Sequence, residues 1–341
     1  MKNTRARILT SVVILAGFVS LLASIAEAHE EGIVNCDLHG DPPHRDSLQA
    51  AINNSFPGGA TIFVTGTCNE NNIFIGGNRA NLTLDGLPLG AATRATISSQ
   101  TPPGTPLINT NATLIVNGAS NVRIGNFIIT GNGTADGPNI QDGANVRLSD
   151  SIIENVFREG VFVRAASARI FGNTIRNNGG DGIVVTENSA LRIGFFSTDE
   201  GIVRPNTIQG NAGNGISLRS STARILGNTT TISGNGGHGI SVFKGSHADI
   251  ASNDISGNGG DGISVRDNSG VNLGSTVSDG VTNVPPVSPV FTQPNTTTEP
   301  NAGFGIRCSI GGYASGEIGT LNGTAGVRSF DKTCIDALPK K

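Results

Sequence analysis

The 341-residue sequence contains no tryptophan, one tyrosine and one methionine. Carbohydrate subsites commonly stack a sugar ring on tryptophan or tyrosine, so the near absence of these two residues counts against a carbohydrate-active enzyme. Charged residues make up only 14% of the chain, and its formal net charge of -3 counts against nucleic acid as a partner. Four cysteines occur, none in a C-x-x-C pair, which counts against a cysteine metal site or redox motif.

Only one apolar run of membrane length is present, and it lies at the amino terminus. Three basic residues precede the stretch 8–25, and the residues at 26–28 have the A-x-A form of a cleavage site. We therefore predict a signal peptide over 1–28 and a protein that is secreted, periplasmic or on the cell surface. An uncleaved anchor is the alternative. After cleavage no membrane span is predicted.

The cysteines fall at the two ends of the mature chain. Cys36 and Cys68 lie near its start, and Cys308 and Cys334 lie near its end. An even number of cysteines in an oxidising compartment predicts one local disulfide at each terminus.

Glycine and asparagine are abundant, with 48 glycines in all, and they recur in a motif of the form N-[GA]-G-x-G-I. The copies span 178–183, 211–216, 235–240, 258–263 and 301–306, and a degenerate copy ends at Gly160-Val161. The underlying period is about 23 residues, interrupted by two longer steps, and such a period indicates a solenoid.

Each repeat contains two short segments in which apolar and polar residues alternate, which is the pattern of half-buried strands. Strands this short cannot bury a face alone, but stacked coils would bury one continuous core of Ile, Val and Leu. Asparagines at equivalent turn positions, such as Asn173, Asn228 and Asn253, would hydrogen-bond from coil to coil. The sequence therefore predicts an all-β parallel β-helix.

Three segments, GNTIRNNGGDGIVV, GNTTTISGNGGHGISV and SNDISGNGGDGISV, resemble the repeats of right-handed parallel β-helix proteins of the pectin-lyase-like superfamily. The resemblance covers about 60–310 and implies a right-handed parallel β-helix solenoid. That superfamily holds lyases, hydrolases, epimerases and adhesins, so the resemblance implies no particular activity and transfers no catalytic residue.

The solenoid interpretation divides the chain into segments. A short capped helix beginning at Asp46-Ser47 is expected to cover the open edge of the first coil. The predicted segments are the signal peptide at 1–28, an N-terminal cap at 29–59, the β-helix at 60–310 with insertions at 195–205 and 275–300, and a C-terminal cap or tail at 311–341.

A file of arginines occupies the same outward position in five successive mid-unit strands. Like charges on stacked strands would lie roughly 4.8 Å apart and repel one another. An anionic polymer with a repeating charge would neutralise them, so we interpret the file as a candidate ligand-binding face. Its members are Arg123, Arg147, Arg169, Arg192 and Arg224. The alternative is that the guanidinium groups stack and lean towards carboxylates in adjoining turns.

A second constellation combines an acid, a base and a cation within two adjacent coils. His238 and Asp261 occupy the variable position of the motif, and Ser241 and Arg266 follow on the next strands. These four residues are the catalytic candidates. The alternative is that they are the polar residues that any exposed glycine-rich turn requires.

No cofactor or metal site is predicted. The GNGGHG and GNGGDG strings match G-x-G-x-x-G, but they recur in every coil and open no helix, which excludes a dinucleotide site. Their aspartate is not at the position that calcium-binding nonapeptide repeats use.

Three hypotheses of function follow. The first is a secreted β-helix that recognises an extended anionic polysaccharide or cell-surface glycan along the arginine file, without catalysis. The second is a polysaccharide lyase or glycoside hydrolase, which leaves open whether the chain is an enzyme. The third is a structural or adhesive solenoid. Nucleic acid is not expected as a partner, and no oligomeric state is predicted.

Overall fold

The computed structural model describes residues 30–38, 47–99, 111–194, 204–274 and 293–339. The predicted signal peptide at 1–28 lies outside these residues, as do most of the predicted insertions at 195–205 and 275–300. Among the residues described, no helix is long and apolar enough to cross a membrane.

The described chain is almost entirely β-structure, arranged as two parallel sheets. The smaller sheet has ten strands: β4 (Ile73–Ile75), β7 (Leu114–Asn117), β10 (Asn139–Gln141), β13 (Val161–Arg164), β16 (Ile183–Thr186), β19 (Ile216–Arg219), β21 (Ile240–Phe243), β23 (Ile263–Val265), β25 (Phe304–Cys308) and β27 (Gly326–Phe330). Each of these strands pairs with the equivalent strand of the next coil, for example Ile216 with Ile240 and Ile240 with Ile263.

The larger sheet has 18 strands and folds around the other side of each coil. One half contains β1 (Glu30–Asn35), β2 (Ala60–Thr65), β5 (Leu82–Asp85), β8 (Val122–Gly125), β11 (Asn145–Ser149), β14 (Ser167–Phe171), β17 (Ala190–Ile193), β24 (Gly270–Leu273), β26 (Tyr313–Ser315) and β28 (Ile335–Ala337). The other half contains β3 (Thr67–Asn69), β6 (Thr96–Ser98), β9 (Ile128–Thr130), β12 (Ile152–Glu154), β15 (Thr174–Arg176) and β18 (Thr207–Gln209). β20 (Thr222–Ser233) and β22 (His247–Ser256) run through both halves.

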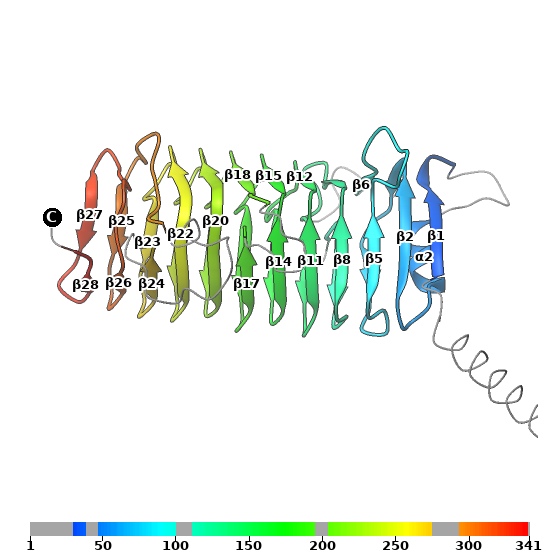
Figure 1. Ribbon diagram of the computed structural model, residues 1–341, viewed down its shortest axis with the longest axis horizontal. Coiled ribbons are helices and arrows are strands. Elements are labelled where there is room, and N and C mark those ends of the chain that lie inside the picture. The colour runs from blue at the N-terminus through cyan, green and yellow to red at the C-terminus, as the bar shows by residue number, and fades with distance from the viewer. Residues whose placement is uncertain (1–29, 39–46, 100–110, 195–203, 275–292, 340–341) are drawn as a thin grey trace, which may run out of the picture.

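The coils stack side by side into one elongated right-handed parallel β-helix, with the strands crossing its long axis (Figure 1). This confirms the predicted fold class. Inward positions alternate with outward ones along the strands, as in the burial of Leu82 and Leu84 in β5. The inward Ile, Val and Leu side chains form one continuous core. Burial of this core against neighbouring coils stabilises strands that are too short to be stable alone.

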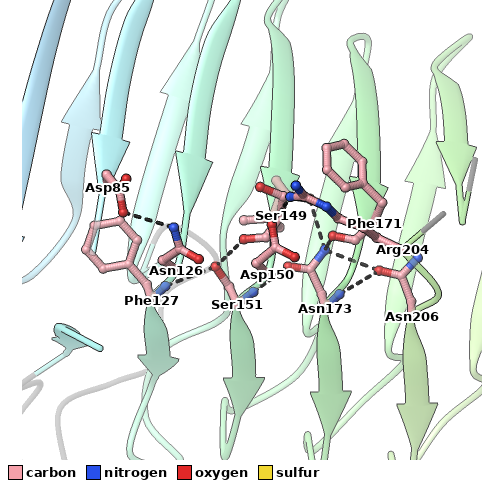
Figure 2. Close-up of polar contacts among 11 residues, drawn as sticks. Asp85, Asn126, Phe127, Ser149, Asp150, Ser151, Phe171, Asn173, Arg204 and Asn206 are labelled. Carbon is pink, nitrogen blue, oxygen red and sulfur yellow. Dashed lines mark hydrogen bonds and ion pairs between the residues drawn. The ribbon is translucent and has the colours of Figure 1, made fainter. Parts of the chain in front are cut away.

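Besides a file of serines (Ser189, Ser221, Ser246 and Ser269), two files of buried polar side chains link the coils at their turns. In the first, the backbone N–H groups of Phe127, Ser151 and Asn173 donate to the side chain of the next coil, at 3.0 to 3.1 Å, ending at Asn206 (Figure 2). The second contains Asn178, Asn211, Asn235, Asn258 and Asn301, and each of the first four donates its side-chain amide to the next member. The predicted stacking is confirmed for Asn173 and for Asn253, which bonds Asn295. The side chain of Asn228 lies outside the described part.

The first coil is covered by the predicted short helix, α2 (Leu48–Asn54), which follows a 3-10 turn, η1 (Cys36–Leu38). The Ser47 hydroxyl caps it by accepting from the Ala50 N–H, and the Glu70 carboxylate accepts from the N–H of Leu48. Its buried residues, Leu48 and Ile52, close the core.

Both predicted disulfides are present. Cys36 is bonded to Cys68 at the start of the solenoid, and Cys308 to Cys334 at its end. The segment predicted as a C-terminal cap or tail, 311–341, contributes β26, β27 and β28 to the two sheets. The domain boundaries at 28, 59 and 310 stay predictions.

Candidate functional site: an arginine row and a buried histidine–aspartate pair

The five arginines predicted to form a file are in register on the larger sheet. Arg147 is the strand partner of both Arg123 and Arg169, and Arg192 is the partner of both Arg169 and Arg224. These five residues are called the arginine row below. They occupy outward positions because each stands between two inward residues of its strand, as in the buried-exposed-buried pattern of β8.

The row crosses five coils of one face, and nearby carboxylates determine how much of its positive charge is neutralised. In the described part of the chain, neither Arg123 nor Arg169 forms an ion pair. Arg147 lies over the ring of Phe171, with its guanidinium carbon 5.4 Å from the ring centroid. Arg224 has its Nε 3.6 Å from Oδ2 of Asp249, the residue that follows it in register. The row therefore presents a band of positive charge that ends at a carboxylate.

Beyond Asp249 the same position is polar and uncharged. Asn272 donates its side-chain amide to Asp249 at 3.0 Å, and the Ser315 hydroxyl donates to Asn272 at 2.8 Å. At the other end, Thr83 pairs with Arg123. The positive band is thus limited to five coils.

The four catalytic candidates lie on the smaller sheet and its preceding turn, and the structure brings them together. Nδ1 of His238 is 3.4 Å from Oδ2 of Asp261. Ser241 pairs with Ser264, but only 3% of Ser241 is exposed, which leaves its hydroxyl with little access to a ligand. Arg266 lies over the ring of Phe243 at 4.4 Å.

His238 and Asp261 belong to a row of turn side chains that bind the backbone of the next coil. Oδ1 of Asp181 accepts from the Asn214 N–H at 2.6 Å, and Oδ1 of Asn214 accepts from the His238 N–H at 2.8 Å. Nδ1 of His238 then accepts from the Asp261 N–H at 2.9 Å, and Oδ1 of Asp261 from the Phe304 N–H at 2.8 Å. We call Asp181, Asn214, His238 and Asp261 the motif row. Its hydrogen bonds hold neighbouring coils together.

The second carboxylate oxygen of Asp261 has an unusual environment. The residue is only 2% exposed, and its Oδ2 has no hydrogen-bond partner among the described residues. Nδ1 of His238 lies 3.4 Å from Oδ2, and Nε of the cationic Arg307 lies 3.9 Å from it. A buried carboxylate oxygen without a donor is an acceptor site that a ligand hydroxyl or water would satisfy.

The hydrogen bonds of His238 restrict its chemistry. Burial lowers the pKa of His238 below its ordinary value of 6.5; Asp261 opposes this effect, and the guanidinium groups of Arg266 and Arg307 add to it. Since Nδ1 accepts the Asp261 N–H, the neutral ring carries its proton on Nε2. In this arrangement Nε2 is a donor and has no lone pair with which to act as a general base.

We expect His238 to make the stability of the protein pH-dependent. Burial lowers the pKa of the ring, and protonation of Nδ1 would also break its bond with the Asp261 N–H, so the folded state favours the neutral ring. Between the folded and unfolded pKa values the unfolded chain binds more protons. The contribution is therefore complete above about pH 6.5 and is lost as the pH falls through the folded pKa.

Thermal unfolding of the wild type and of His238→Asn checks this expectation. Asparagine supplies the same kind of acceptor, as Asn214 does one coil earlier, but does not titrate. The two proteins should have similar Tm values at neutral pH, and the wild type should fall below the variant by a few degrees in mildly acidic buffer. A constant difference at all pH values would show that His238 does not titrate with folding.

An acidic group lies farther along the same face, at Glu159. Burial raises the pKa of Glu159, and the nearby carboxylate of Asp136 raises it further. The guanidinium group of Arg158 forms an ion pair with Asp136, with Nη2 2.5 Å from Oδ2, and its Nε lies 3.5 Å from Oε2 of Glu159. Because this cluster and His238 are separated by the coils of Asp181 and Asn214, the two do not form one catalytic pair.

The described residues offer one group of three potential metal ligands, Cys36, Cys68 and Glu70. Both sulfurs are joined in a disulfide, and the carboxylate of Glu70 accepts from the N–H groups of Leu48 and Gln49 at the start of α2. These ligand atoms already have structural partners, and the group does not fit a metal ion.

Several residues of these sites were not among the sequence candidates. Arg307 is in register with Ser264, and it directly follows the motif copy at 301–306. Asp249 continues the arginine row, and its place in the repeat could have identified it. The guanidinium carbon of Arg219 is 5.4 Å from the ring centroid of Phe243, over which Arg266 also lies. Arg219 and Arg266 occupy the same position of the repeat, which could have identified Arg219.

Comparison with known proteins agrees with this geometry. A family model described as a right handed beta helix region matches residues 49–197 and 193–314. An alginate lyase from Paenibacillus sp. str. FPU-7 has 17% identity and a TM-score of 0.50, with 91% of this chain and 100% of that chain covered. A tailspike domain of bacteriophage CBA120 has 13% identity and a TM-score of 0.56, covering 89% of this chain and 46% of that one.

A third similar structure, ORF18 of Geobacillus virus E2, has 14% identity and a TM-score of 0.50, covering 94% of this chain and 64% of that one. No curated protein sequence matches the chain significantly. The stacked coils and turn ladders define a parallel β-helix protein of the pectin-lyase-like kind. The chain belongs to the right-handed β-helix family.

Proposed function

We propose that this protein binds an extended anionic polysaccharide along the arginine row. The observation that supports this most is the register of five arginines on successive strands of one face. Coils repeat about every 4.8 Å, so the row offers a regular series of cationic groups to a polymer lying along the solenoid axis. A single small anion would neutralise only one or two of them.

The class of polymer is suggested by chemistry and by fold. Guanidinium groups bind carboxylates and sulfates through paired hydrogen bonds, and both groups occur on acidic polysaccharides. One of the similar structures is an alginate lyase, whose named polymer is a polyuronate. At 17% identity that likeness concerns the fold and assigns no role to a residue here.

Replacement of three central arginines should abolish binding. In Arg147→Ala, Arg169→Ala and Arg192→Ala combined, two intact arginines lie at opposite ends of the row, and we expect at least about a hundredfold loss of affinity, as for roughly 3 kcal/mol. The measurement is titration of acidic polysaccharides against the immobilised protein at two salt concentrations. Binding of the wild type should weaken steeply as salt increases.

The control variant removes three positive charges from positions outside the arginine row. Arg94, Arg328 and Lys332 are exposed and lie off the row, so their combined change to Ala should leave the affinity within about twofold. Replacing the three row arginines by Lys separates charge from guanidinium geometry. Equal losses in the row variant and the charge control would refute a specific row, and absence of polysaccharide binding by the wild type would refute the function.

Catalysis on the smaller sheet is the second candidate. It is favoured by the buried Oδ2 of Asp261, which accepts no hydrogen bond from the described residues and lies near His238 and Arg307. The occupied Nδ1 of His238 and the burial of Ser241 count against a base or nucleophile in this place. A lyase would release an unsaturated product that absorbs in the ultraviolet, and a hydrolase would release reducing ends. Neither signal is expected.

The third candidate is a structural or adhesive solenoid without a saccharide ligand.

The two disulfides suit an oxidising compartment, and together with the predicted leader they support export of the chain. We propose that it works outside the cytoplasm, where acidic polysaccharides occur. Fractionation of the expressed full-length chain, with amino-terminal sequencing of the product, tests both export and cleavage near residue 28.

A further inference from the structure

A depression lies beside the end of the arginine row that faces Asp249. It measures about 370 Å³ and is formed by outward residues of three adjacent coils, on β17, β20 and β22. We call it the row-end depression. Its outward residues are Ala190, Arg192, Thr222, Arg224, His247 and Asp249. A volume of this size accommodates a single pyranose unit.

Small side chains create the depression. Ala190, Thr222 and His247 are consecutive strand partners in the column next to the arginine row. The small side chains of Ala190 and Thr222 form the bottom of the depression, and the exposed ring of His247 closes one end. Behind this ring the next coil has Gly270, where an added Cβ would lie 3.0 Å from Cδ2 of His247 and 3.3 Å from Cδ1 of Tyr313. Both rings therefore lie next to the position that a side chain at Gly270 would occupy.

The polar groups of the depression suit an acidic sugar. Arg192 and Arg224 supply positive charge along one side, and Asp249 supplies a carboxylate at the end of that side. Oδ1 of Asp249 accepts from Asn272, and Oδ2 is 3.6 Å from Arg224, so the carboxylate retains lone pairs for ligand hydroxyls. An anionic substituent and hydroxyl groups on one ring would satisfy both kinds of group.

We infer that the row-end depression binds one pyranose unit of the polymer, with its anionic group at Arg192 and Arg224, its hydroxyls at Asp249 and its ring against His247. This inference rests on the proposed function and adds to it. The arginine row recognises repeated charge and would accept any flexible polyanion. The depression selects a saccharide among polyanions and fixes the register of the bound chain.

The test compares a saccharide with a non-saccharide anion. Trigalacturonate and hexaglutamate are titrated into the wild type and into His247→Ala and Asp249→Ala, each prepared as the full chain. Both variants should weaken trigalacturonate binding about tenfold, the equivalent of ~1.4 kcal/mol, and leave hexaglutamate within about twofold. The triple arginine variant should weaken both ligands.

Matched controls lie in the same two columns. Asn145→Ala removes an exposed side chain from the column of His247, and Thr83→Ala shortens one in the column of Asp249, beyond the far end of the arginine row. Neither residue lines the depression. If the His247 and Asp249 variants change neither ligand, or change both equally, the depression is not a saccharide site, although the arginine row can still bind polymer. If no variant of the row affects binding either, the proposed function fails as well.

Discussion

The Asn235→Leu variant should lose about 4 kcal/mol of stability, because several buried polar groups would lose their partners at once. Oδ1 of Asn235 accepts from the backbone and side-chain amides of Asn211 at 3.2 and 2.9 Å. Its amide donates to the Ile208 carbonyl at 3.2 Å and to Oδ1 of Asn258 at 2.9 Å. Leucine has a similar size but satisfies none of these groups.

The expected loss is large because the site is closed to water. Asn235 is 1% exposed, and its neighbours in the ladder, Asn211 and Asn258, are equally buried. Chemical denaturation followed by circular dichroism measures the effect. Asn145→Leu is the control, since Asn145 is exposed and donates only to the Ser167 hydroxyl, so its change should stay within about 0.5 kcal/mol. Similar losses in the two variants would show that the ladder contributes little.

The Gly239→Ala variant should be destabilised by about 3 kcal/mol through overpacking. A Cβ added at Gly239 would lie 2.5 Å from Cγ2 of Ile255, 2.7 Å from the Gly262 carbonyl oxygen and 2.9 Å from the Asn258 amide nitrogen. All three belong to the next coil, and the ladder and the strand pairing fix their positions. The coils would have to separate locally to admit one methyl group.

The control for this prediction is Gly32→Ala. Gly32 lies in β1, and an added Cβ there meets nothing within 4 Å. Thermal unfolding should separate the two variants clearly, with Gly32→Ala unfolding near the wild-type temperature. An unchanged Tm for Gly239→Ala would mean that adjacent coils are packed less closely than the structure describes.

The register of the arginine row could be predicted because the repeat fixes it. Strand residues point alternately inward and outward, and each coil adds one strand at the same place, so Arg123 and Arg147 had to be partners once the period was known. The disulfides were predicted on other grounds, since the four cysteines fall in two pairs, one near each end of the mature chain.

Insertions limited what else could be predicted. Asn206 and Asn295 occupy regular positions in the stack, but each follows a segment that departs from the period. Counting along the chain therefore loses the register at these places, whereas hydrogen bonding between coils restores it. Sequence spacing gives no signal for where an excursion returns.

The role of His238 could not be predicted for a different reason. The repeat shows that its position varies among Asp, Asn, His and Phe, which suggests an exposed and functional turn. The structure shows that four of the side chains at this position accept an N–H from the following coil. Hydrogen bonds to a neighbouring coil depend on how turns stack, and a list of residue types does not contain that information.

The two disulfides have a consequence for how the solenoid unfolds. A stack whose units contact only their neighbours loses structure first at its ends, where a coil has one neighbour instead of two. Here Cys36–Cys68 joins the first coil to the second, and Cys308–Cys334 links the last two. Because a disulfide holds the coils together at each end, the terminal coils should not unfold separately. The whole solenoid should therefore unfold as one cooperative unit. Reduction would release the ends and turn a single sharp transition into gradual shortening from both tips.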